Sequence, residues 1–177
     1  PVAPVVTTTP ATCSAAGTAT ITNYSAANTY VFTPSGPTAG AAGVITGMVA
    51  GTSYTVTASV SPCTSPASAS FSIQAMLVTP VAPVVTTTAA TCSAAGIATI
   101  TNYSSANTYT FSPSGPSANS GTISGMVAGT SYTVTATSNA SSCISPASAA
   151  FSIQAMLVTP VAPVVTTTPA TCSAAGT

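Results

Sequence analysis

The chain repeats itself, and this repetition constrains its fold more than any other feature. The phrase PVAPVVTTT, followed by a short segment ending in TCSAAG, begins at Pro1, Pro80 and Pro160. The period is therefore 79 and then 80 residues. A period this long predicts a series of similar domains and not a solenoid of short coils. We expect two repeats at residues 1–79 and 80–159, and the truncated start of a third at 160–177.

Apolar and hydroxyl side chains alternate within each repeat, which is the pattern of half-buried β-strands. In residues 29–33, Tyr30 and Phe32 are predicted to face the core, while Val31, replaced by Thr110 in the second repeat, faces solvent. The pattern predicts strands over residues 3–9, 18–22, 29–33, 43–46, 53–60 and 68–74. Six or seven short strands per repeat predict an all-β fold of small β-sandwiches.

The chain has no Lys, Arg, Asp, Glu or His among its 177 residues. Acid–base catalysis draws mainly on these side chains, hard cations need carboxylates, and phosphate recognition needs Lys or Arg. We therefore expect no enzyme, no catalytic residue, no cofactor or metal site, and no nucleic-acid partner. No apolar run approaches the ~18 residues of a membrane helix, so no membrane insertion is expected in this segment.

Each complete repeat has two cysteines, Cys13 and Cys63 in the first and Cys92 and Cys143 in the second. Without His or a C-x-x-C motif, structural disulfides are favoured over zinc or redox sites. Disulfides stabilise small domains in oxidising compartments, which predicts an extracellular protein. Cys172 belongs to the truncated third repeat, and its partner is expected outside these residues.

Two disulfide pairings are compatible with the sequence. The simpler one lies within each repeat, as Cys13–Cys63 and Cys92–Cys143. In an alternating sandwich of seven strands, however, the loops that carry Cys13 and Cys63 lie at opposite ends. Cys13 would then reach Cys143 of the next repeat. Residues 33–43 decide whether a repeat has six or seven strands, so both pairings stay open, with the in-repeat pairing favoured.

The motif Gly51-Thr52-x-Tyr54-x-Val56 follows an apolar residue and a glycine, and it recurs in the second repeat. It resembles the corner before a late strand in fibronectin type III and related immunoglobulin-like domains. The resemblance implies that the Tyr54 hydroxyl, and that of Tyr132, caps this corner. The matching residues of the second repeat are Gly129, Thr130, Tyr132 and Val134.

Further motifs cover most of each repeat: a threonine–cysteine pair with a later glycine, and a second cysteine before S-P-A-S. These residues are Thr12, Cys13, Gly17, Cys63, Ser65, Pro66, Ala67 and Ser68. They resemble the tandem repeats of very large SprB-like adhesins from gliding Bacteroidota. The resemblance implies export, surface display and a linear array of Ig-like domains of about 80 residues. Those repeats usually carry Asp, which is absent here, so no calcium site follows.

These observations predict a stalk or filament segment of an extracellular bacterial adhesin, acting as a spacer in surface attachment or gliding. Expected partners are neighbouring repeats of the same chain, with other filament chains or surface glycans as further candidates. One alternative is a binding module whose Thr/Asn-rich face contacts ice or polysaccharide. Another is a self-assembling sheath or surface layer. Outward threonines that suggest such a face are Thr18, Thr20, Thr22, Thr55 and Thr57.

Two smaller groups of residues are also candidates for surface interactions. Tyr24 and Tyr103 lie in loop-like segments and are expected to be exposed, unlike the other aromatic residues. Asn23, Asn102 and Asn139 each begin an N-x-Ser sequon, the pattern of an N-glycosylation acceptor. Chance produces such matches readily in a chain this rich in Asn, Ser and Thr.

Overall fold

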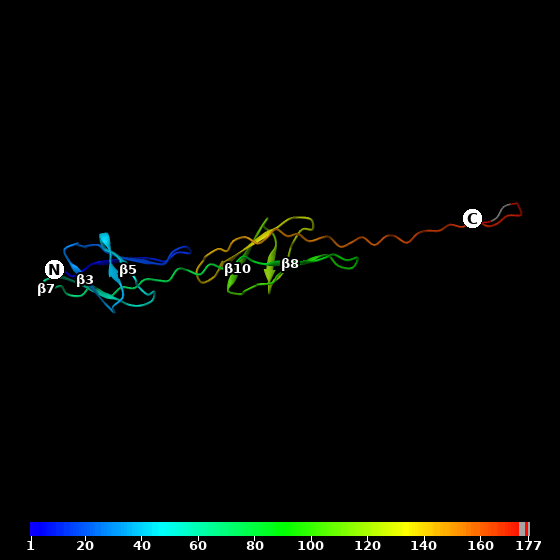
Figure 1. Cartoon of the computed structure of the whole chain (residues 1–177). Helices are drawn as coiled ribbons and strands as arrows, with labels where there is room; N and C mark the ends of the chain where they lie inside the picture. Colours follow the sequence, from blue (N-terminus) through cyan, green and yellow to red (C-terminus); the bar gives the residue numbers. More distant parts are fainter. Residues whose placement is uncertain (174–175, 177) are drawn as a thin grey trace. The chain divides into compact units, whose positions relative to one another are not determined.

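The computed structural model describes residues 1–173 and Gly176 (Figure 1). Regular structure in this part of the chain is β-strand, apart from a short 3-10 segment at Ala41–Gly43. The described residues after Pro160 form no strand, and residues 174, 175 and 177 of the predicted third repeat lie outside the description. The chain thus has an all-β fold, as the alternating pattern predicts.

The chain divides into two compact units. Unit 1 comprises Pro1–Ala82, Ser105–Tyr109 and Thr135–Ala147. Unit 2 comprises Pro83–Ser104, Thr110–Val134 and Ser148–Thr177. Unit 1 therefore holds the whole first repeat together with three short segments of the second, the first of them residues 80–82.

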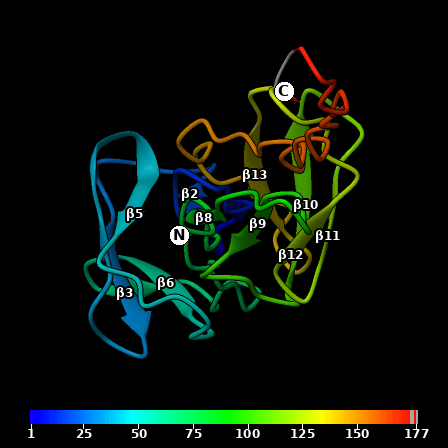
Figure 2. The same ribbon diagram turned by 90° about the vertical axis from the view of Figure 1, so that its right-hand side faces the viewer.

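Unit 1 contains two antiparallel sheets built from the first repeat. The first has the order β1-β2-β5-β4, with β1 at Val6–Thr9, β2 at Thr18–Ile21, β5 at Val44–Thr46 and β4 at Thr38–Ala39. The second has the order β3-β6-β7, with β3 at Thr29–Thr33, β6 at Thr55–Val60 and β7 at Cys63–Thr64 (Figure 2). The first repeat therefore has seven strands.

Two of these strands differ from the sequence prediction. β4 is a two-residue strand that the pattern did not indicate, because it is too short to alternate. The strand predicted over residues 68–74 is wrong: only Phe71 forms a β-bridge there, with Tyr54. β6 pairs instead with the shorter strand β7, where Val60 lies opposite Cys63 and Ser59 lies opposite Thr64. Pro66 and the paired serines between these points interrupt a regular ladder.

The second repeat has the corresponding sheets. One has the order β11-β12-β9-β8, with β11 at Ser117–Asn119, β12 at Thr122–Ser124, β9 at Ile97–Ile100 and β8 at Val85–Thr88. The other pairs β10 at Asn107–Ser112 with β13 at Thr133–Ser138. The counterpart of β7 is reduced to a single bridge between Thr137 and Ile144.

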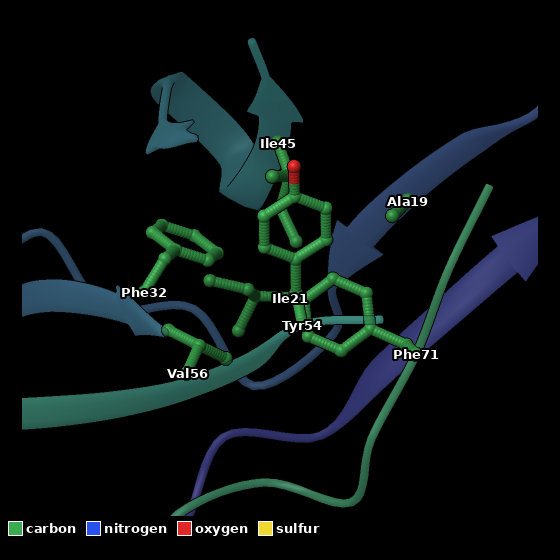
Figure 3. Packing of buried hydrophobic residues seen from close by; sticks show 7 residues of the cluster. All are labelled: Ala19, Ile21, Phe32, Ile45, Tyr54, Val56 and Phe71. Atoms are coloured by element: carbon green, nitrogen blue, oxygen red, sulfur yellow. The ribbon is translucent and has the colours of Figure 1, made fainter. Parts of the chain in front are cut away.

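Side chains from both sheets of the first repeat form one apolar cluster (Figure 3). Its buried members are Ala19, Ile21, Phe32, Ile45, Tyr54, Val56 and Phe71. The alternation explains this core, since in β2 the side chains of Ala19 and Ile21 are buried between outward threonines. Unit 2 buries the equivalent seven positions: Ala98, Ile100, Phe111, Ile123, Tyr132, Val134 and Phe151. The repeated sequence therefore buries equivalent positions in both repeats.

The predicted orientation of the third strand is confirmed in part. Phe32 is 5% exposed and Val31 is 57% exposed, as expected. Tyr30 is only half-buried, and its ring stacks on Tyr24 with centroids 5.3 Å apart. Tyr24 and Tyr103, expected to be exposed, are half-buried instead. Tyr24 was misplaced because stacking and contact with the cluster partly cover its ring.

Candidate functional site: the cysteine loops

A disulfide joins Cys13 to Cys143 within unit 1, across 130 positions of sequence. The two Cα atoms are 5.7 Å apart, inside the usual range for a disulfide. Cys63, Cys92 and Cys172 are free thiols in the structure, and all three are exposed. The in-repeat pairing that the sequence favoured is therefore not observed, and the between-repeat alternative is.

Strand order explains why Cys13 does not meet Cys63. β1 and β2 are antiparallel, and residues 22–28 join β2 to β3 at the end of the repeat where β1 begins. β3 and β6 are also antiparallel, so β6 returns to that same end. Cys63 follows β6 there, whereas Cys13 follows β1 at the opposite end. The short β4 brings the count to seven strands, the number for which the sequence placed these two loops at opposite ends.

The loop that carries Cys13 is held from both sides. Within it, the Thr12 N–H donates to Ala15 O at 2.8 Å, and Thr12 Oγ1 accepts the Ala15 N–H at 3.1 Å. The segment that leaves the first repeat runs alongside, since the Leu77 N–H donates to Thr12 O at 3.0 Å. The Gly17 N–H donates to Gln74 O at 2.9 Å. The backbone around Cys13 is therefore held by hydrogen bonds in addition to the disulfide.

Gly17 permits this close approach. A Cβ atom at this position would lie 2.8 Å from Thr9 O and 3.2 Å from Gln74 N, both of them backbone atoms. Gly96 has the same surroundings in the second repeat, where a Cβ would lie 2.8 Å from Thr88 O. This packing gives a physical reason for the glycine four residues after the cysteine in both repeats.

The loop that carries Cys92 repeats these bonds. The Thr91 N–H donates to Ala94 O at 2.8 Å, and the Leu157 N–H donates to Thr91 O at 2.9 Å. The Gly96 N–H donates to Gln154 O at 3.0 Å. Cys92 thus stands in the same local frame as Cys13 but carries a free, exposed thiol.

Cys143 and Cys63 occupy equivalent places beside the sixth strand of their repeats. Each lies two residues before the S-P-A-S motif. The residue after each pairs with the same strand position, Thr64 with Ser59 and Ile144 with Thr137. The turn before Cys143 is two residues longer, and within unit 1 its Ser141 Oγ donates to Val78 O at 2.8 Å. Cys143 is fully buried, whereas Cys63 is exposed.

The S-P-A-S motif replaces a regular ladder with paired serines. Ser65 donates its N–H to Ala58 O at 2.8 Å and accepts the Ala58 N–H on its Oγ at 2.9 Å. Ser68 does the same with Val56, at 2.9 Å and 3.1 Å. The pattern recurs in the second repeat with Ser145 on Ala136 and Ser148 on Val134. Each buried serine thus satisfies strand groups that the intervening proline and alanine leave without a ladder partner.

Tyr54 and Tyr132 lie at the corner that the resemblance implies. The Val49 N–H donates to the Tyr54 hydroxyl oxygen at 3.1 Å, and the Val127 N–H donates to that of Tyr132, also at 3.1 Å. Both rings are buried, at 4% exposure, against Phe71 and Phe151 respectively. The hydroxyl therefore caps the backbone five residues upstream while the ring fills the core.

The sequon asparagines have structural roles that the sequence analysis missed. Asn23 accepts the Val5 N–H at 2.8 Å and donates to Ala3 O at 3.0 Å. Its amide thereby acts as a ladder partner for the proline-containing first segment, and Asn102 accepts the Val84 N–H in the same way. Asn139 donates from its amide to Ser105 O at 3.4 Å. A glycan on Asn23 or Asn139 would disturb these amide bonds.

The predicted threonine face is present on the first sheet but is not continuous. Thr9 and Thr18 face each other with hydroxyl oxygens 2.7 Å apart, and Thr20 lies opposite Thr7. Val44 interrupts the face beside Thr20. In the second repeat, Ile97 takes the place of Thr18. A lattice-matched hydroxyl array, as ice recognition requires, is therefore broken within each repeat.

The described part of the chain contains no group of three or more Cys that is placed to hold a metal ion. Among the same residues, no helix is long and apolar enough to cross a membrane. Neither a search of protein-family models nor a search of curated proteins finds a match to this chain.

Proposed function

We propose that this chain is a load-bearing segment of an extracellular stalk or filament, a spacer in a bacterial surface adhesin. The observation that carries the proposal is the disulfide from Cys13 to Cys143, which ties one sequence repeat covalently to the next. A covalent bond between neighbouring repeats favours a mechanical role. The neighbouring repeats of the same chain are then the primary partners.

The strand order supports assignment of each repeat to an Ig-like sandwich. An Ig constant-type domain has strands in the orders A-B-E-D and C-F-G. The first repeat has the orders β1-β2-β5-β4 and β3-β6-β7, which correspond strand for strand. The Tyr54 bond to Val49 corresponds to the tyrosine corner of the same family of sandwiches. We infer a tandem series of such domains.

The force path supports a stalk. When the chain is pulled from its ends, tension passes from Cys13 through the disulfide to Cys143. Residues 14–142 lie outside this path, so their strands bear little of the load. In the chain-entropy model a disulfide that closes a loop of this length stabilises the fold by roughly 5 kcal/mol.

The surface chemistry supports an extracellular site. The disulfide requires an oxidising compartment to persist. A surface without ionisable carboxylates, amines or imidazoles keeps the same charge over a wide range of pH and salt. Both properties suit a filament exposed to a variable medium.

Polysaccharide binding is a second candidate, favoured by one observation. A shallow polar hollow lined by Thr8, Thr9, Pro10, Ser72 and Gln74 recurs at the equivalent place in the second repeat. Binding of neutral glycans on an array, lost in a Gln74→Leu/Gln154→Leu variant, would support this candidate. Lateral assembly into a sheath would instead appear as sheets in electron micrographs of the purified chain.

Single-molecule force spectroscopy on the whole chain, pulled from both ends, tests the stalk proposal. Without reductant, residues 14–142 should not extend. After reduction, unfolding should release about 440 Å more, because the disulfide spans 130 positions of sequence and an extended chain measures roughly 3.4 Å per residue. A Cys13→Ser variant is the control and should release this length with or without reductant. Full extension of the unreduced chain would contradict the proposal.

A further inference from the structure

We propose that Cys92 and Cys63 are the two halves of further disulfides of the Cys13–Cys143 kind. Cys92 takes the second cysteine of another repeat, and Cys63 takes the first cysteine of another repeat. The inference deepens the proposed stalk function, on which it rests, by naming the partner: more repeats of this sequence. Every junction between successive repeats would then carry the same covalent clamp.

The loop that contains Cys92 already has the backbone hydrogen bonds of the bonded Cys13 loop. Cys13 is bonded, and its loop is held by Thr12, Gly17 and Leu77 through backbone bonds. The loop of Cys92 has the same three bonds through Thr91, Gly96 and Leu157, at closely similar distances. The Cys13 loop and the Cys92 loop thus have the same backbone hydrogen bonds. They differ in that Cys13 is in a disulfide and Cys92 is a free thiol.

The half that contains Cys63 has the backbone register of Cys143. Both cysteines precede a residue that pairs with the same position of the sixth strand, Ser59 or Thr137. Cys143 is 0% exposed in its disulfide, whereas Cys63 is exposed as a free thiol. A cysteine that is covered when bonded and open when unbonded matches a contact surface without its partner.

The reaction is thiol–disulfide exchange with a small disulfide such as oxidised glutathione. The Cys92 thiolate attacks one glutathione sulfur, forms a mixed disulfide and releases one reduced glutathione. The Cys63 thiolate of the other repeat then attacks the Cys92 sulfur and releases the second reduced glutathione. Two protein thiols lose two electrons and two protons, and one glutathione disulfide takes them up.

The partner repeat has two sources with the same chemistry: a further repeat in the same chain, or a second copy of this chain. The chain itself contains both halves, so its own copies are a sufficient probe. Cys172 belongs to the same class of cysteine as Cys92 and is removed by Cys172→Ser to leave one acceptor. In native material, linked peptides found in species of single-chain mass identify the same-chain source, and multiples of that mass identify the second copy.

The test mixes equal amounts of ¹⁴N- and ¹⁵N-labelled Cys172→Ser chain in a glutathione redox buffer, followed by a non-reducing digest and mass spectrometry. We expect every chain to contain Cys13–Cys143. We also expect Cys63–Cys92 peptides of mixed isotope in about tenfold excess over mixed-isotope Cys63–Cys63 and Cys92–Cys92 peptides together, a preference of roughly 1.4 kcal/mol. Random pairing, as in denaturant, gives heterotypic and homotypic links in equal amounts.

A matched pair of variants tests whether the loop directs the pairing. Thr91→Val removes the hydroxyl that accepts the Ala94 N–H at 3.0 Å and should lower the heterotypic excess severalfold. Thr87→Val, an equally exposed change nearby on β8, should leave it unchanged.

In the isotope mixture, random pairing in the folded chain, Cys63–Cys92 links of unmixed isotope only, or glutathione adducts alone would overturn the inference. It would also be overturned by free thiols at Cys92 in native material. None of these results would alter the force response of the Cys13–Cys143 bond, so failure here is distinct from failure of the stalk proposal.

Discussion

Cys63 and Cys143 occupy equivalent positions in the two repeats, but only Cys143 forms a disulfide. Both lie beside the sixth strand, two residues before an S-P-A-S motif. Cys143 is buried and bonded to Cys13, whereas Cys63 is an exposed thiol. Local sequence therefore places each cysteine at the same point of the sixth strand but does not decide whether it is bonded.

Cys13 and Cys92 give the same comparison from the other half of the bond. Their loops share hydrogen bonds and a close-packed glycine, yet one is bonded and one is free. The common features of the repeats account for folding within each repeat. The link between repeats is the disulfide, which Cys13 forms and the equivalent Cys92 does not.

The largest expected effect is a difference in the free energy of unfolding between variants of Cys13 and of Cys92. In dilute unreduced chain, Cys13→Ser should lower the free energy of unfolding by about 3–5 kcal/mol, because it opens the long disulfide loop. Cys92→Ser should change it by less than about 0.5 kcal/mol, as an exposed substitution without a bonded partner. Chemical denaturation followed by fluorescence of the six tyrosines measures both. Equal losses in the two variants would reject the assigned pairing.

A second prediction concerns the serines that both repeats share. Ser68→Ala leaves the buried Val56 N–H without its acceptor and should cost about 1–3 kcal/mol. Ser148→Ala should cost the same, because it leaves the Val134 N–H in the same position. Ser70→Ala, at an exposed position, is the matched control for both. Denaturation of the unreduced chain checks the set, and unequal costs at Ser68 and Ser148 would show that the repeats are not equivalent here.

The tyrosine corner provides a smaller comparison. Tyr54→Phe and Tyr132→Phe keep the buried ring and remove the acceptor of one backbone N–H. Each should lower the free energy of unfolding by about 1 kcal/mol, the net contribution of a typical hydrogen bond. Hydrogen exchange at the amides of Val49 and Val127 gives a direct readout and should accelerate in the corresponding variant. Unchanged exchange rates would show that the tyrosine hydroxyl does not stabilise this corner.

The smallest expected effect is that of pH. Stability depends on pH only when the folded and unfolded states bind different numbers of protons. The chain has no carboxylate, imidazole, amine or guanidine side chain, so the melting temperature should stay nearly constant between about pH 4 and 8. Salt should act weakly as well, since no side-chain charges are present to screen. A melting series on unreduced chain checks this, and a shift of many degrees would reveal a titrating modification.

The sequence alone determined most of the fold within a repeat. Alternation along a strand is a local property with a period of two, so the burial of Ile21, Phe32 and Val56 and the exposure of Val31 followed from it. The tyrosine corner followed from a local motif at Tyr54 and Tyr132. These features depend on residues close together in the chain, so the amino-acid sequence shows their patterns directly.

Tertiary structure decided the features that depend on distant residues. β4 is two residues long, too short to show alternation, so the count of seven strands emerged only from the structure. The serine pairs on β6 depend on how the chain turns back after Val60, which the local pattern does not show. The disulfide joins atoms 130 positions apart, so spacing within a repeat did not identify the partner. Chain direction at the end of each strand, which no local pattern records, determined which cysteine Cys13 reaches.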